Sequence, residues 1–105
     1  MTKAKKTSNV FADLGLPDAD DLLARAELTR QIYNAIKDRG LSQSQAGEIL
    51  GLKQPDVSLL MRGKYTRFST DRLLNLLVKL GRNIEIVIRN PRSAKTDGKL
   101  TVVAA

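Results

Sequence analysis

Apolar residues in the first half of the chain recur at the spacing of a helix. Leu28, Ile32 and Ile36 recur at four-residue spacing, and Leu22, Ala26 and Tyr33 lie beside that stripe. Such a stripe forms one face of a helix. We expect the helix to begin near Asp18 or Asp20, because acidic side chains stabilise the free N–H groups of a first turn. It should end at Arg39 and Gly40, since a cation followed by glycine is typical of helix ends.

Two shorter helices are predicted next. The first begins after Ser42, a residue type that caps helix N-termini well, and ends before Gly51. The second begins near Gln54 and ends at Gly63. Pro55 suits the first helical position, because its fixed φ matches the helix and its missing N–H leaves no donor unsatisfied.

A fourth helix follows a basic turn at Lys64 to Phe68. Ser69 or Thr70 caps it, and it ends at Leu80, before Gly81. Its apolar residues are Leu73, Leu74, Leu76, Leu77, Val78 and Leu80. These positions surround most of the helix, which is more than one buried face needs. We expect either that the core nearly encloses this helix or that one side of it faces a second subunit.

Residues 83–89 predict a strand, because polar and apolar positions alternate and place Ile84, Ile86 and Ile88 on one face. A lone strand leaves its backbone N–H and C=O groups unpaired. Its partner is either the same strand of a second subunit or residues 100–103 folded back. We favour the first, a two-fold dimer, with contacts from Leu77, Leu80, Ile84, Ile86 and Ile88.

The two ends differ from this middle part. Residues 1–17 join a basic arm to a short apolar segment, which contains Val10, Phe11, Leu14 and Leu16. The segment either folds over the first helix and completes the core or folds on binding a partner protein. We therefore expect an arm at 1–17, a mainly α-helical domain of four to five helices and one C-terminal strand at 18–89, and a basic tail at 90–105.

The inventory of reactive side chains argues against an enzyme. The 105 residues include no Cys and no His, which excludes disulfides and removes thiolates, the usual zinc ligands and the commonest general base. The eleven acidic residues form one cluster only, at Asp18, Asp20 and Asp21, where the helix dipole accounts for them. We expect no catalytic residue, no metal site and no cofactor.

The net charge of +7 is unevenly distributed. Residues 1–52 hold seven basic and seven acidic side chains, whereas residues 53–105 hold eleven basic and four acidic ones. This asymmetry suits a polyanionic partner. The chain has no apolar run long enough to cross a membrane, and no apolar stretch typical of a secretory signal follows the basic N-terminus. We therefore expect a cytoplasmic protein.

The second and third predicted helices have the spacing of a helix-turn-helix. Gly47 supplies the small residue on the inner face of the helix that follows Ser42, and Gly51 allows a positive φ in the turn between the two helices. The angle between the helices can be filled by Ala46, Leu50, Leu52, Val57 and Leu60. Two details depart from the usual pattern. The small inner position is more often alanine, and Gly47 costs the helix about 1 kcal/mol relative to alanine. The residue before the second of these helices is often Ser or Thr, whereas here it is Lys53, a poor cap. A helical hairpin packed for its own sake is the alternative, but it leaves the basic second half unexplained.

Residues 41–63 resemble the phage-repressor-like (XRE-type) helix-turn-helix family. The wider stretch 9–90 looks like its HigA-type antitoxin branch, on the segments Asn9-Val10-Phe11, Leu52-Lys53-Gln54-Pro55-Asp56-Val57-Ser58 and Ile84-Glu85-Ile86. The resemblance implies a dimeric repressor that binds double-stranded DNA at a palindromic operator and regulates its own operon. Such a repressor is often paired with a RelE- or HigB-like toxin that cleaves messenger RNA, whose candidate contacts here are Val10, Phe11, Leu14 and Leu16. A stand-alone XRE-type repressor, or a protein-binding adaptor or inhibitor, is the alternative.

In this binding mode the third helix enters the major groove with its N-terminal residues nearest the bases. Gln54 could pair with adenine and Leu59 could contact a thymine methyl group, whereas Asp56 either accepts from a cytosine amine or only stabilises the first turn. The expected base contacts are Gln54, Pro55, Asp56, Ser58, Leu59 and Arg62. The expected phosphate contacts, which position the protein without specifying sequence, are Gln43, Lys53, Lys64, Tyr65, Thr66 and Arg67. Tyr65 alternatively belongs to the edge of the core.

Overall fold

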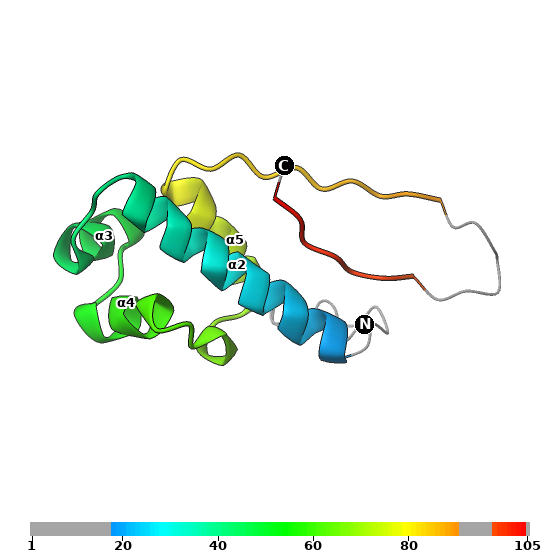
Figure 1. Cartoon of the computed structure of the whole chain (residues 1–105), viewed down its shortest axis with the longest axis horizontal. Coiled ribbons are helices and arrows are strands. Elements are labelled where there is room, and N and C mark those ends of the chain that lie inside the picture. The colour runs from blue at the N-terminus through cyan, green and yellow to red at the C-terminus, as the bar shows by residue number, and fades with distance from the viewer. Residues whose placement is uncertain (1–17, 91–97, 105) are drawn as a thin grey trace.

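A computed structural model describes residues 18–90 and 98–104 of the chain. One long helix forms the axis of the molecule, with a second helix packed along it and two short helices at one end (Figure 1). In chain order the elements are α2 (Asp18–Asp38), α3 (Gln43–Leu50), α4 (Gln54–Met61), the 3-10 turn η2 (Tyr65–Arg67) and α5 (Thr70–Lys79). The mainly α-helical fold and the four predicted helices are confirmed.

Local side-chain contacts account for where α3, α4 and α5 begin. Ser42 caps α3 in a reciprocal pair with Gln45: the Gln45 N–H donates to Ser42 Oγ at 3.0 Å, and the Ser42 N–H donates to Gln45 Oε1 at 2.9 Å. Ser69 Oγ accepts from the Arg72 N–H at the start of α5. Lys53 precedes α4 without a side-chain cap, and proline occupies the first turn instead. The weak cap predicted at Lys53 is therefore confirmed.

Each of the four helices ends at a glycine with positive φ, at Gly40, Gly51, Gly63 and Gly81. At Gly63, where φ is 75°, the Gly63 N–H donates to Leu60 O and the Lys64 N–H donates to Leu59 O. These bonds satisfy carbonyls that the end of a helix otherwise leaves free, in a conformation that favours glycine. The chain thus leaves α4 in a fixed direction, and this direction determines where the basic turn lies.

A mostly aliphatic core, to which Phe68 also belongs, holds the helices together. Its most deeply buried members come from all four helices and are Ile32, Ile36, Leu50, Val57, Leu60 and Leu73. Leu22 and Tyr33, which the sequence placed beside the α2 stripe, are each 38% exposed and lie at its edge. Ala24 and Ala35 are buried instead, and Ala35 belongs to the core that the helices share.

α5 buries one face in this core and leaves another open. The residues Leu73, Leu76, Leu77 and Leu80 are buried within their own chain. Leu74 is only partly buried and Val78 is 53% exposed. The predicted dimer contacts Leu77 and Leu80 therefore lie inside the domain, and Leu74 and Val78 are the apolar residues that α5 presents outward.

Residues 83–90 form an extended, exposed segment without the predicted strand. No backbone hydrogen bond pairs it with any other part of the described chain, so the ladder that defines a strand has not formed. Residues 98–104 return in the opposite direction (Figure 1). They contact the helices rather than pair with residues 83–90: Val102 packs against the core, and the Leu100 N–H lies 3.4 Å from Asp20 Oδ2.

Candidate nucleic-acid interface

Gly47 determines how closely the turn and α4 approach α3. A Cβ atom at this position would lie 2.8 Å from the carbonyl oxygen of Leu52 and 3.4 Å from Cγ2 of Val57. The same Leu52 donates its N–H to Gly47 O at 2.9 Å. The first contact is closer than real Cβ atoms approach backbone, so alanine does not fit here without a shift of the turn. This contact explains the departure from the usual alanine.

α4 is fixed by two buried residues and presents a polar face away from the core. Val57 and Leu60 are buried in the core. Gln54, Ser58 and Arg62 follow one another at four-residue spacing, which places them on one face of the helix. Gln54 and Arg62 are exposed and Ser58 is half-buried. This stripe is a polar surface of α4 that a ligand can reach.

The other expected base contacts lie beside this stripe. Pro55 is exposed and Asp56 is half-buried in the first turn of α4. Leu59 is partly buried and packs against the core, because it lies next to Leu60 on the flank of the helix. Part of its apolar surface is therefore unavailable for a thymine methyl group.

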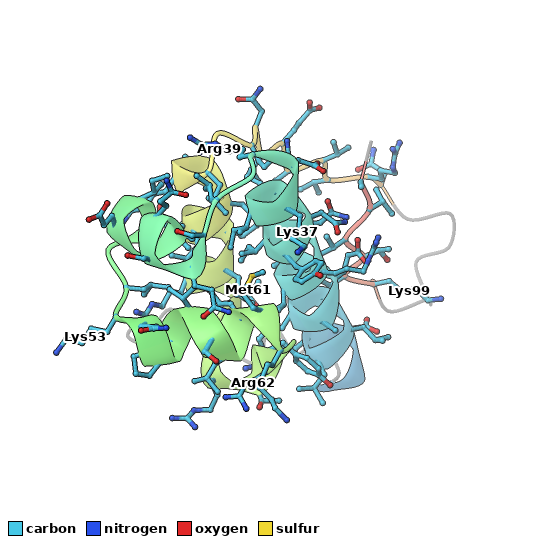
Figure 2. All side chains as sticks on the ribbon, turned by 60° about the vertical axis from the view of Figure 1, so that its left-hand side comes forward. Lys37, Arg39, Lys53, Met61, Arg62 and Lys99 are labelled. Atoms are coloured by element: carbon cyan, nitrogen blue, oxygen red, sulfur yellow. The ribbon has the colours of Figure 1, made fainter. Side chains whose placement is uncertain are left out.

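Exposed cations lie at both ends of α4. Lys53 projects from its N-terminus and Arg62 from its C-terminus (Figure 2). Lys64, Thr66 and Arg67 are exposed in the turn that follows. Tyr65 is half-buried in the same turn, and Gln43 is half-buried in the first turn of α3. The expected phosphate contacts therefore gather around the ends of α3 and α4, with Tyr65 between the core and the surface.

A hydrogen-bonded network that the sequence did not predict attaches the basic turn to α2. Arg25 donates to Phe68 O at 3.2 Å and to Asp21 Oδ2 at 2.8 Å. The hydroxyl of Thr70, a buried residue, donates to Asp21 Oδ1 at 3.0 Å. The guanidinium of Arg72 covers the Phe68 ring at 5.4 Å. Because these contacts hold both the end of the turn and the start of α5, they fix the turn relative to α2.

The described residues include no group of three or more His, Cys, Asp or Glu side chains that could hold a metal ion. Within the same residues, no helix is both long and apolar enough to cross a membrane. The expected toxin contacts Val10, Phe11, Leu14 and Leu16 lie outside the part of the chain that the structure describes.

Comparison with known proteins identifies the same motif. Residues 10–89 match a family model described as "Helix-turn-helix domain". A solved structure titled "Putative XRE Family Transcriptional Regulator" is 37% identical to this chain, with a TM-score of 0.78; the match covers 85% of this chain and 100% of that one. No curated protein matches the chain. The chain therefore belongs to this helix-turn-helix family and is of the XRE type that its motif resembles.

Proposed function

We propose that this protein is a DNA-binding transcriptional regulator that inserts α4 into the major groove. The observation that carries the proposal is the polar Gln54–Ser58–Arg62 stripe, exposed at both ends, on a helix whose opposite side is fixed in the core. A major groove is wide enough for one α-helix, and polar side chains on its outer face can reach base edges. The XRE-family title of the similar structure supports the same function.

The charges around α4 suit the backbone on either side of that groove. Lys53, Lys64 and Arg67 are exposed at the two ends of the helix, where the flanking phosphates of a bound duplex run. Gln43 lies at the N-terminus of α3, where free backbone N–H groups also favour an anion. These residues set the position of α4, and Gln54 is the side chain best suited to distinguish adenine by a bidentate pair.

Gln54→Ala and Lys64→Ala test this division of roles. On DNA from upstream of the protein's own gene, Gln54→Ala should reduce the preference over a scrambled duplex by about tenfold, because it removes a base contact. Lys64→Ala should weaken binding to both duplexes equally and lower the salt slope by about 1. Fluorescence anisotropy titrations at several salt concentrations measure both effects.

The matched control is Lys99→Ala, because Lys99 is also exposed but lies on the side of the molecule remote from α4 (Figure 2). It should leave affinity and preference nearly unchanged. If neither Gln54→Ala nor Lys64→Ala weakened or relaxed binding, the placement of α4 in the groove would be wrong.

We propose further that two copies bind a palindromic operator as a dimer. A two-fold dimer would place two α4 helices about one turn of DNA apart, roughly 34 Å. The exposed isoleucines of residues 84–88 and the outward side of α5 at Leu74 and Val78 support this proposal, because within the described residues they leave apolar surface only partly covered.

The HigA-type resemblance supports a more specific role, the antitoxin of a toxin-antitoxin pair that represses its own operon. The alternative is a stand-alone repressor with the same DNA-binding domain. A protein-binding adaptor has weaker support, because it does not use the polar stripe of α4.

The antitoxin role is tested by expressing the neighbouring reading frame. A small basic protein encoded there should arrest growth when expressed alone, and co-expression of this chain should restore growth. Deletion of residues 1–17 should abolish that rescue and preserve DNA binding. A harmless neighbour would exclude the antitoxin role and leave the regulator.

A further inference from the structure

A shallow cleft separates α2 from the C-terminal end of α4, next to the face proposed to contact DNA. Arg30 and Tyr33 line it from α2, and Arg62 and Tyr65 line it from the opposite side. Met61 lies between the two helices in Figure 2, with Arg62 projecting beyond it. The cleft therefore brings a cation of α2 to the same opening as a cation at the end of α4.

Arg30 is exposed, and its guanidinium is oriented by Glu27. Arg30 Nη2 donates to Glu27 Oε2 at 2.9 Å, and Arg30 Nε lies 3.2 Å from Oε1. Gln31 also donates to Glu27 Oε2, at 2.7 Å. The hydrogen bonds from Arg30 and then Gln31 lower the pKa of the Glu27 carboxyl below its usual value, so Glu27 is charged at neutral pH. A guanidinium has five N–H donors, and those that Glu27 does not engage are available to a second anion.

We propose that Arg30 binds a backbone phosphate of the DNA held by α4, and that Glu27 limits the strength of this contact. This inference rests on the proposed DNA-binding function. A phosphate fits better than a base, because Arg30 reaches the cleft from α2 and not from α4, the helix proposed to enter the groove, whereas the phosphates flank the groove. Glu27 holds the guanidinium in a fixed plane and offsets part of its charge. α2 would thus be a third helix that contacts DNA, after α4 and α3. Lys37, whose Nζ lies 5.7 Å from the centre of the Tyr33 ring, follows farther along the same face of α2.

The chain offers a matched control in a second ion pair. Arg82 Nη2 lies 2.9 Å from Asp38 Oδ2, and both side chains are exposed. Figure 2 shows Arg39, the neighbour of Asp38, on the opposite side of the molecule from Arg62. Neither Arg82 nor Asp38 lines the cleft. Arg82→Gln and Asp38→Asn therefore change the net charge in the same way as Arg30→Gln and Glu27→Gln, but at a different place on the surface.

The test is a double-mutant cycle on the full chain, with binding to upstream DNA measured by fluorescence anisotropy from about 50 to 200 mM salt, a range over which several phosphate contacts change affinity by orders of magnitude. Arg30→Gln should weaken binding about fivefold and lower the salt slope by about 0.9, the contribution of one phosphate contact. Glu27→Gln should strengthen binding about twofold to fivefold, and this gain should disappear when Arg30 is also replaced. Arg82→Gln and Asp38→Asn should each change affinity less than about twofold.

Equal effects of Arg30→Gln and Arg82→Gln would overturn the inference, since both would then act only through net charge. A gain from Glu27→Gln that persists without Arg30 would overturn it as well. In either case the proposed function would still hold, provided that the wild-type protein binds the upstream DNA. A wild-type chain that does not bind DNA would reject the proposed function and this contact together. Circular dichroism and the melting temperature identify any variant that fails to fold.

Discussion

At position 47 two opposing effects of glycine act on the same helix. Glycine in a helix interior costs about 1 kcal/mol relative to alanine, because it loses more backbone freedom on folding. The structure opposes this with a backbone contact, since a Cβ atom would lie 2.8 Å from Leu52 O. That oxygen belongs to the turn between α3 and α4 and cannot rotate away as a side chain would. The space available, rather than helix propensity, selects the residue.

Gly47→Ala should therefore lower the free energy of unfolding by about 1–2 kcal/mol, in spite of the better helix former, because the turn must move. Urea denaturation measures the change. Ser44→Ala is the control, because Ser44 is exposed on the same helix and should change stability by less than about 0.5 kcal/mol. A more stable Gly47→Ala protein would mean that the turn adjusts easily and that glycine has another role there.

The helices themselves were predictable because their signals are local. Ser42 and Ser69 begin helices by accepting from a backbone N–H three residues later, and a glycine with positive φ follows each helix. Both effects depend on a few neighbouring residues, so the sequence alone predicts the bounds of all four helices closely. The exposed positions Gln54 and Arg62 follow from the same periodicity.

Contacts between distant elements were not predictable in this way. Arg25 and Phe68 are 43 residues apart in sequence, and Asp21 and Thr70 are 49 apart. Only the four-residue spacing of Asp21 and Arg25 on α2 is visible in the sequence. The burial of Leu59 and Leu77 was not predictable for the same reason. Helical periodicity indicates that a residue lies near an apolar face, but the packing of all the helices determines how much of its side chain is buried.

The predicted strand at residues 83–89 also depends on contacts beyond its own neighbourhood, here at the scale of the whole molecule. Residues 83–89 alternate as a strand does, yet a strand forms only when another extended segment accepts and donates its backbone hydrogen bonds. In the described part of one chain no such partner pairs with it. Ile86 is 76% exposed and Ile88 is 91% exposed, an arrangement that costs free energy in water and favours association.

A second copy is the partner that we propose for this segment, and Ile86 is the residue at which to test it. In an antiparallel pair about a two-fold axis near Ile86, Ile86→Lys would place two like charges opposite each other and remove apolar area. Sedimentation velocity at micromolar concentration should detect a dimer in the wild-type protein. In the variant the dimer dissociation constant should rise at least about tenfold, so that the protein sediments mostly as a monomer. Val103→Lys adds the same charge at an exposed apolar residue of the other extended segment and should leave the dimer intact.

On DNA, Ile86→Lys should weaken binding to a palindrome by about a hundredfold and leave binding to a single half-site unchanged, because only the palindrome benefits from two linked α4 helices. A wild-type chain that sediments as a monomer would contradict the dimer while leaving the single-site binding of α4 untouched.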